Sequence, residues 1–101
     1  MYGTVATMRV KPGMEAKLNE LSDRWWRERA SKIRGAMSET VYKKDSSSNE
    51  YIMAVIFDSK ENYDTNAGDP EQDRWFQEFR ACLESDPVWN DGEVVFHQHQ
   101  R

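Results

Sequence analysis

The chain has 101 residues, of which 14 are Lys or Arg and 18 are Asp or Glu, so its formal net charge is −4. This length predicts one domain, spanning residues 1–101, and the scattered basic residues disfavour nucleic-acid binding, which needs a clustered basic face. The single cysteine, Cys82, excludes an intramolecular disulfide, and no stretch predicts a signal peptide or a membrane span, so we expect a cytoplasmic protein.

The first half of the chain predicts a strand, a helix and a second strand. Residues 2–10 favour a strand, which a Pro-Gly turn ends. Residues 14–34 favour a helix with an apolar stripe that includes Trp25, which we interpret as a core residue. Gly35 then stands where a C-cap glycine is expected. The polar residues 36–44 are typical of a strand at the edge of a sheet.

The stretch 51–57 is the most apolar in the chain, and we predict that it forms a strand buried on both faces. A buried helix is the alternative, but the β-branched and aromatic content and the short length favour a strand. Because successive strand residues point to opposite faces, the side chains divide into two sets. One set is Tyr51, Met53, Val55 and Phe57, and the other is Ile52, Ala54 and Ile56.

Two further helices and a last strand complete the pattern. Residues 59–66 favour a short helix capped by a serine. Asp69 is suited to the N-cap of a second long helix over 70–84, and Gln72 to closing a capping box. A turn at the following Asp-Gly pair is expected to lead into a last strand over 93–100.

This order, β-α-β-β-α-β, predicts an α+β fold of the ferredoxin-like class. Right-handed crossovers place both long helices on one face of the sheet, with the third strand beside the first. The other face of the 51–57 strand then has no cover within the chain. We therefore expect a homodimer packed sheet to sheet, and the pattern leaves open which set of side chains faces the partner.

With this order of elements, the chain resembles the antibiotic biosynthesis monooxygenase domain family, whose members are dimeric α+β barrels. The likeness spans nearly the whole chain and is one of pattern. The stretches that carry it are Met8–Gly13 with Glu15 and Leu18, Val55–Ser59 with Glu61, and Trp75-Phe76 with the terminal strand.

The resemblance implies a pocket between the sheet and the helices of each subunit. The family includes cofactor-free oxygenases of polycyclic phenols and quinols, whose pockets use Asn, Trp, Tyr and Arg. It also includes haem-degrading enzymes, which use an Asn on the first strand and a His on the second long helix. This chain has neither residue at those places, so haem degradation is disfavoured, and we expect no cofactor.

Three residues are candidates for catalysis: Tyr63, Asn66 and His97. Tyr63 and Asn66 lie in a short segment that is suited to a pocket lid, where Asn66 could hydrogen-bond a phenolate. Capping and turn formation are the structural alternatives. His97 could carry a proton, or it could pair with His99 on one strand face to bind a metal. We expect solvated histidines and no metal.

Four residues are candidates for substrate binding: Trp75, Phe76, Trp26 and Tyr42. Trp75 and Phe76 could form an aromatic wall for a flat ligand, with core packing as the alternative. Trp26 lies off the apolar stripe of its helix, so we expect it to be exposed, at a subunit contact or lining a pocket. Tyr42 could face the pocket or pack in the sheet. Trp89 is expected to seal the end of the barrel.

Arg9 and Arg34 could hold an anionic substrate group, although both also suit a plain surface position. Cys82 falls on an apolar stripe, which favours a buried structural thiol over a nucleophile. The leading functional hypothesis is a cofactor-independent monooxygenase acting on a small aromatic or quinol-like substrate. The alternative is a non-catalytic dimeric module that binds a small apolar or aromatic molecule.

Overall fold

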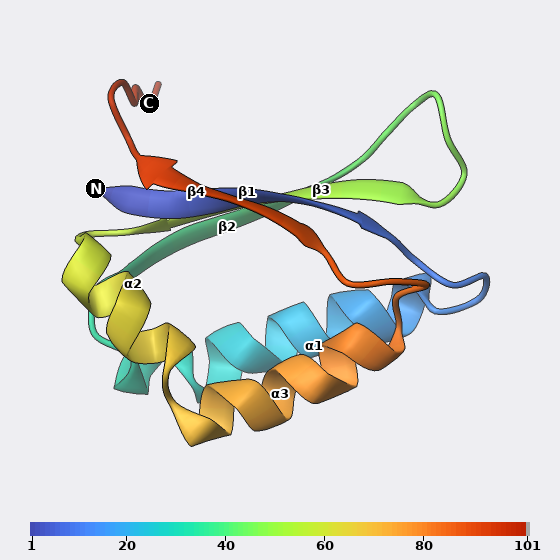
Figure 1. Ribbon diagram of the computed structural model, residues 1–101, viewed down its shortest axis with the longest axis horizontal. Helices are drawn as coiled ribbons and strands as arrows, with labels where there is room; N and C mark the ends of the chain where they lie inside the picture. The colour runs from blue at the N-terminus through green and yellow to red at the C-terminus, as the bar shows by residue number, and fades with distance from the viewer. Residues whose placement is uncertain (101) are drawn as a thin grey trace.

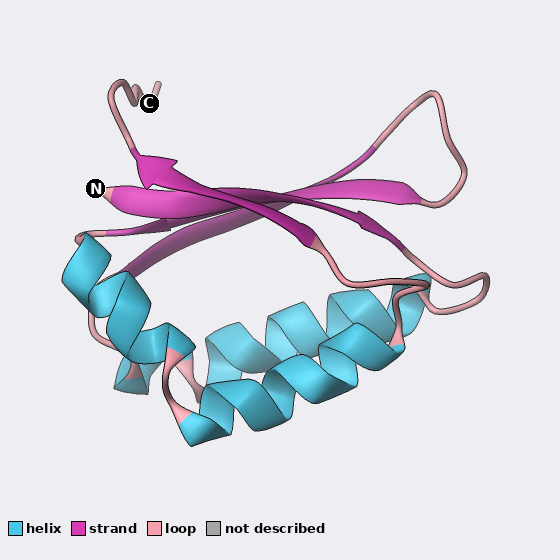
Figure 2. Ribbon diagram, in the orientation of Figure 1, coloured by secondary structure: helices cyan, strands magenta, loops and turns pink. Residues whose placement is uncertain are grey.

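The computed structural model describes residues 1–100, which form a four-stranded sheet with its helices on one face (Figures 1 and 2). The strand order is β2-β3-β1-β4, and every neighbouring pair is antiparallel. This confirms the predicted ferredoxin-like α+β fold, with the third strand beside the first. The elements are β1 (Tyr2–Arg9), α1 (Glu15–Glu28), the 3-10 helix η1 (Ala30–Lys32), β2 (Ala36–Lys43), β3 (Glu50–Phe57), α2 (Lys60–Ala67), α3 (Pro70–Ala81) and β4 (Val88–Glu93).

The register of the sheet decides which side chains of β3 face the helices. Tyr51 pairs with Met8 and Met53 with Ala6, and all four side chains are buried. Side chains alternate along a strand, so Ile52, Ala54 and Ile56 point to the other face. That face carries no helix (Figure 1), and Val5, the partner of Ala54, is 47% exposed on it. The set that begins at Tyr51 therefore lies under the helices.

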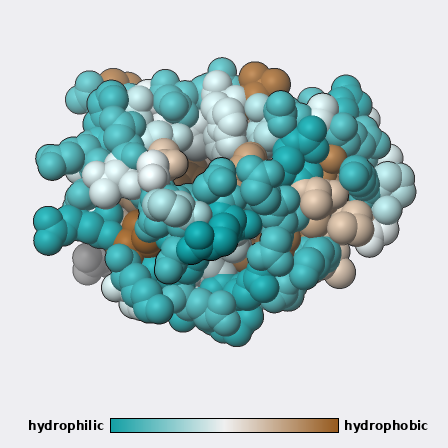
Figure 3. All heavy atoms as spheres, turned by 60° about the horizontal axis from the view of Figure 1, so that its bottom comes forward, coloured by the Kyte–Doolittle hydropathy of each residue, from teal (hydrophilic) through white to brown (hydrophobic). Residues whose placement is uncertain are grey.

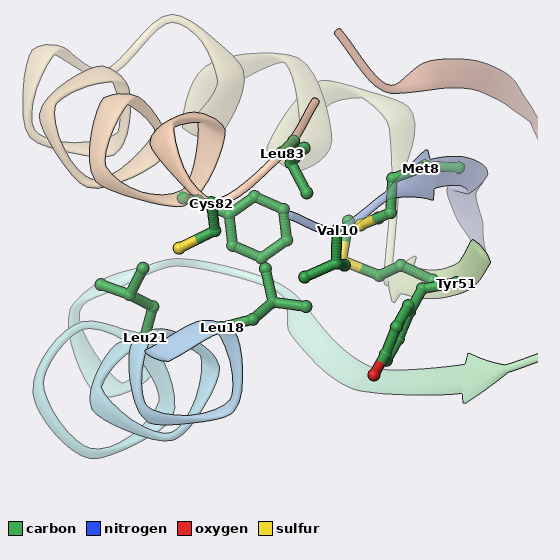
Figure 4. Close-up of a cluster of buried hydrophobic side chains, with 10 residues drawn as sticks. Met8, Val10, Leu18, Leu21, Tyr51, Cys82 and Leu83 are labelled. Carbon is green, nitrogen blue, oxygen red and sulfur yellow. The ribbon is translucent and has the colours of Figure 1, made fainter. Parts of the chain in front are cut away.

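The core lies at one end of the layer between helices and sheet, where α1 begins and α3 ends (Figure 4). Side chains from both helices meet there over β1 and β3. They are aliphatic or sulfur-containing residues for the most part, and those that are almost completely buried stabilise the fold by roughly 1.5–3 kcal/mol each. The members include Met8, Val10, Leu18, Leu21, Tyr51, Phe79, Cys82 and Leu83.

Helix α1 ends earlier than predicted, at Glu28 instead of residue 34. Arg29 is its C-cap, and this side chain binds the first turn of α3 through Glu71 at 2.7 Å. Gly35 is therefore no helix cap. It has φ +85, which returns the chain into β2, and a Cβ there would overlap the carboxylate of Asp58.

The start of α3 confirms one cap and corrects another. The Asp69 carboxylate accepts a hydrogen bond from the backbone N–H of Glu71 at 2.9 Å, as expected for an N-cap before Pro70. Gln72 closes no capping box. Its side-chain oxygen instead accepts from the indole of Trp25, because the indole is partly buried and needs an acceptor.

The prediction for the last strand was wrong. Strand β4 is Val88–Glu93, and the Asp-Gly pair expected to form a turn lies inside it, where Asp91 pairs with Thr4. Residues 94–100 form no strand and leave the sheet beside the N-terminus (Figure 1). The strand begins early because Pro87 stops the preceding turn and Val88 already pairs with Thr7 of β1.

The outer surface of the helices is largely hydrophilic (Figure 3). Ion pairs within and between the helices contribute to it, such as Arg24 of α1 with Glu78 of α3 at 2.7 Å. No helix formed by residues 1–100 is long and apolar enough to cross a membrane. The large apolar side chains that stay exposed lie instead on the bare sheet face, in β4 and in the C-terminal segment, where Val95 is 92% exposed.

Candidate ligand-binding cavity

A cavity of about 400 Å³ lies at the other end of the layer between helices and sheet. The carboxyl end of α1, the amino end of α3, helix α2 and the strands enclose it. Its walls are largely apolar, and aromatic side chains contribute many of them. All four tryptophans of the chain line it, together with Phe57, Tyr63, Phe76 and Phe79.

The aromatic rings pack against one another around the cavity. Trp26 and Trp25 meet edge to face with centroids 5.1 Å apart, and Trp25 lies 6.5 Å from Trp75. Trp75 then stacks on Phe79 at 5.1 Å. Such ring pairs stabilise beyond their buried area, by about 0.5–1.5 kcal/mol each. The wall is therefore preorganised to offer ring surfaces to a ligand.

Three indole N–H groups in this wall are already used within the protein. Each donates to an acceptor of the fold, so these tryptophans offer a ligand their ring surface and not an N–H group. The distances are 2.7 Å from Trp25 to Gln72 Oε1, 3.0 Å from Trp26 to Glu39 Oε1, and 2.9 Å from Trp75 to the Leu21 carbonyl.

Two polar atoms at the cavity have no hydrogen-bond partner among the described residues. They are Thr4 Oγ1 on β1 and Asn66 Oδ1 on α2. Thr4 is only 5% exposed, so its hydroxyl is deprived of water as well. Buried polar atoms of this kind are uncommon because each costs about 1–3 kcal/mol. The Thr4 hydroxyl lies near enough to Tyr63 to lower its pKa in part, but it does not meet the geometry of a hydrogen bond, so both atoms are available to bind a ligand.

Tyr63 and Asp91 form a polar pair at the same cavity. The Tyr63 hydroxyl donates to Asp91 Oδ1 at 2.9 Å. The Tyr63 ring packs edge to face on Tyr2 and on Phe57, at 5.2 and 5.6 Å. Burial and the Asp91 carboxylate raise the pKa of Tyr63 to about 12. Tyr63 therefore stays a neutral hydrogen-bond donor at physiological pH.

Four carboxyl side chains line the cavity, and among residues 1–100 no Lys, Arg or His does. Asp64 is paired with Lys60 at 2.7 Å. Within residues 1–100, the other three have no ion-pair partner; they are Glu39, Asp73 and Asp91. The described part of the chain contains no group of three or more His, Cys, Asp and Glu side chains suited to hold a metal ion.

The structure brings five of the seven predicted site residues to this cavity: Tyr63, Asn66, Trp75, Phe76 and Trp26. Two lie elsewhere in the chain. Tyr42 is 59% exposed on the bare face of the sheet, because it alternates with Val41 along β2. His97 lies in the exposed segment after β4, since that strand ends at Glu93.

Sequence reasoning missed Thr4, Glu39 and Asp91 as cavity residues. For two of them, the alternation of side chains between the two faces of the strand indicated a position on the helix-covered face. Thr4 is the polar member of a row that continues with Ala6 and Met8, and Glu39 shares a face with Val41. A polar residue within such a row is a candidate for a site. Asp91 was assigned to a turn, which concealed its position on β4.

Solved structures with the same fold include several described as antibiotic biosynthesis monooxygenases. One has a TM-score of 0.73 at 12% identity, over 94% of this chain and 99% of that one. A candidate member from Caulobacter crescentus CB15 has a TM-score of 0.80 at 15% identity, with 94% and 90% covered. A variant of SnoaB, described as a cofactor-independent oxygenase from Streptomyces nogalater, has a TM-score of 0.76 at 11% identity, with 98% and 97% covered.

These similarities confirm the resemblance noted from the sequence at the level of the fold: the chain has the fold of the antibiotic biosynthesis monooxygenases. The sequence itself matches no protein-family model and no curated protein. Identities this low leave activity and substrate to be argued from the cavity.

Proposed function

We propose that the chain binds a small flat aromatic molecule in this cavity and oxygenates it without a cofactor. The observation that carries the proposal is a preorganised aromatic wall with uncommitted polar atoms, Thr4 Oγ1 and Asn66 Oδ1, beside it. Pockets for small molecules typically combine apolar walls with a few polar groups that fix orientation. The shared fold with a structure described as a cofactor-independent oxygenase adds support by analogy.

The chemistry that this proposal requires is balanced without an external reductant. An electron-rich ring bearing a CH₂ group loses a proton and gives one electron to O₂. The substrate radical and superoxide combine to a hydroperoxide. Loss of water leaves a carbonyl, so one oxygen atom enters the product and the other leaves as water. The protein has to accept the proton, orient the ring and exclude water.

Asp91 and Tyr63 suit the proton-handling part of this reaction. Tyr63 stays protonated because its pKa is raised to about 12, so it serves as a donor that orients the Asp91 carboxylate at 2.9 Å. The carboxylate is then the proton acceptor. The Thr4 hydroxyl would donate to an oxygen atom of the substrate, and Asn66 Oδ1 would accept from a substrate O–H or N–H group.

Oxygen uptake with a panel of anthrone-type and quinol substrates tests the proposal. We expect consumption of one O₂ per product and, with ¹⁸O₂, one labelled oxygen atom in the product. Replacing a general base typically costs 10²–10⁴-fold, so Asp91→Asn is expected to lower kcat/KM by roughly 100-fold. The control Asp45→Asn, in the exposed loop between β2 and β3, is expected to leave the rate unchanged. Equal rates in the two variants would exclude Asp91 as the base.

A second function, non-catalytic binding of an aromatic molecule, is favoured by one observation. No Lys, Arg or His of the described part of the chain lines the cavity, so no side chain there stabilises a substrate anion by charge. Native mass spectrometry of freshly purified protein distinguishes the two functions. Two results together would favour binding over catalysis. One is an aromatic ligand that stays bound and gains no oxygen atom, and the other is no consumption of oxygen with any substrate of the panel.

We also propose that the protein is a homodimer packed through the bare sheet face. Val5 of β1 and Val88 of β4 are 47% and 61% exposed there, and Ile52, Ala54 and Ile56 of β3 point to the same side. A second copy would cover this surface. Light scattering at micromolar concentration is expected to give twice the 11.9 kDa chain mass, and Ile52→Lys to give a monomer. A monomeric wild type would refute the proposal.

A further inference from the structure

We infer that the ligand of this cavity carries a positive charge: a flat aromatic ring system with a protonated amine or a quaternary nitrogen. The inference rests on the proposed function only in assuming that the cavity binds a small aromatic molecule. It names the charge of that molecule, which neither the fold nor its relatives specify.

The charges around the cavity give the first argument. Four carboxyl groups line it, and no basic side chain of the residues that the structure describes does so. Only Asp64 has its charge offset by an ion pair, with Lys60 at 2.7 Å. Glu39 accepts two hydrogen bonds, from Ser22 and Trp26, which hold its carboxylate in place without neutralising it. Asp73 and Asp91 are exposed, which weakens their field by solvent screening, but the unpaired charges at the cavity are all negative and favour a cation, above all at low salt.

The aromatic wall gives the second argument. A cation is attracted to the face of an aromatic ring, most strongly to that of tryptophan. Trp25, Trp26 and Trp75 use their N–H groups within the protein, so these three rings offer an anionic ligand no indole donor. They offer a cationic ring system their faces, which attract it.

The unpartnered polar atoms give the third argument. Thr4 is nine-tenths buried or more, and its Oγ1 lines the cavity without a partner. Asn66 Oδ1 is an acceptor in the same situation. Asn66 Oδ1 can only accept, so a ligand N–H group satisfies it and a carboxylate or sulfonate would not; the Thr4 hydroxyl can donate or accept and suits either ligand.

Calorimetric titration with three two-ring probes of different charge tests the inference. The probes are 1-methylquinolinium, which is a cation, 1-methylnaphthalene, which is neutral, and 1-naphthoate, which is an anion. At neutral pH and low salt, we expect the cation to bind about tenfold more tightly than the neutral probe, as desolvated cation–π contacts allow, and the anion to bind least.

A matched pair of double variants separates the cavity charges from the net charge of the protein. Glu39→Gln with Asp73→Asn removes two cavity carboxylates and is expected to reduce the preference for the cation about fivefold, with binding of the neutral probe unchanged. Glu28→Gln with Asp45→Asn removes two exposed acids outside the cavity lining and is expected to keep the preference. Circular dichroism checks that both pairs fold.

If the neutral or the anionic probe binds as tightly as the cation, the inferred charge of the ligand is wrong while the aromatic cavity stands. If both double variants lower the preference equally, it comes from net charge and not from the cavity, and the inference again fails. If none of the three probes binds, the proposed ligand cavity itself is refuted.

Discussion

Replacing Thr4 by valine is expected to stabilise the protein, although most substitutions of buried residues destabilise. The Thr4 side chain is 5% exposed and its hydroxyl has no partner among residues 1–100. An unpaired buried hydroxyl costs about 1–3 kcal/mol. Valine keeps the β-branched shape and the preference for a strand, and it replaces the hydroxyl by a methyl group. We expect the free energy of unfolding to rise by about 1–2 kcal/mol.

Urea denaturation followed by circular dichroism measures this change, at one fixed protein concentration because a dimer would make stability concentration-dependent. Thermal unfolding should shift upward by about 5–10 °C for a domain of this size. Thr65→Val, at an exposed position of α2, is the control and is expected to stay within about 0.5 kcal/mol. An unchanged or lower stability of Thr4→Val would show that the hydroxyl has a partner in the empty protein.

Other predictions concern Tyr63 and two glycines. In a spectroscopic titration, Tyr63 is expected to ionise near pH 12, and Tyr63→Phe to remove that step. Because its folded pKa lies above the ordinary value of 10.0, the stabilisation linked to it is complete below pH 10 and is lost as the pH rises toward 12. Gly35→Ala is expected to destabilise by at least about 1 kcal/mol more than Gly13→Ala in chemical denaturation. Both glycines have positive φ, but only a Cβ at Gly35 would overlap a neighbour, Asp58; equal losses would refute this steric argument.

The order of elements and the strand arrangement could be predicted because they follow from local patterns. The apolar run at 51–57 requires a cover on both faces, and the N-cap before Pro70 marks a helix start. The ends of elements were less predictable. Gly35 has the dihedral angles that a helix cap would also need, and only the contact with Asp58 shows that it serves the turn into β2.

The aromatic part of the cavity could be predicted, since Trp75, Phe76 and Trp26 were expected to form a wall for a flat ligand. The polar part could not, because it depends on which residues lie opposite one another across the sheet. Asp91 and Thr4 are 87 positions apart in the sequence and become partners only in the register of β4 with β1. The Asp-Gly pair predicts a turn, which places the expected strand too late in the sequence. No local signal then specifies which of its residues pair with β1.

The Thr4 hydroxyl connects the stability of the fold to its proposed function. Natural sequences violate the rules of packing mainly where function requires it, and an unpaired buried hydroxyl is such a violation. If Thr4→Val stabilises the protein and also weakens binding of a cationic two-ring probe that carries N–H groups, such as 1-naphthylmethylammonium, the hydroxyl is kept for a ligand at the expense of stability. If it stabilises the protein and binding of the probe is unchanged, the unpaired Thr4 hydroxyl has no role in binding. Asn66 Oδ1 is then the only one of the two atoms that recognises a ligand N–H group.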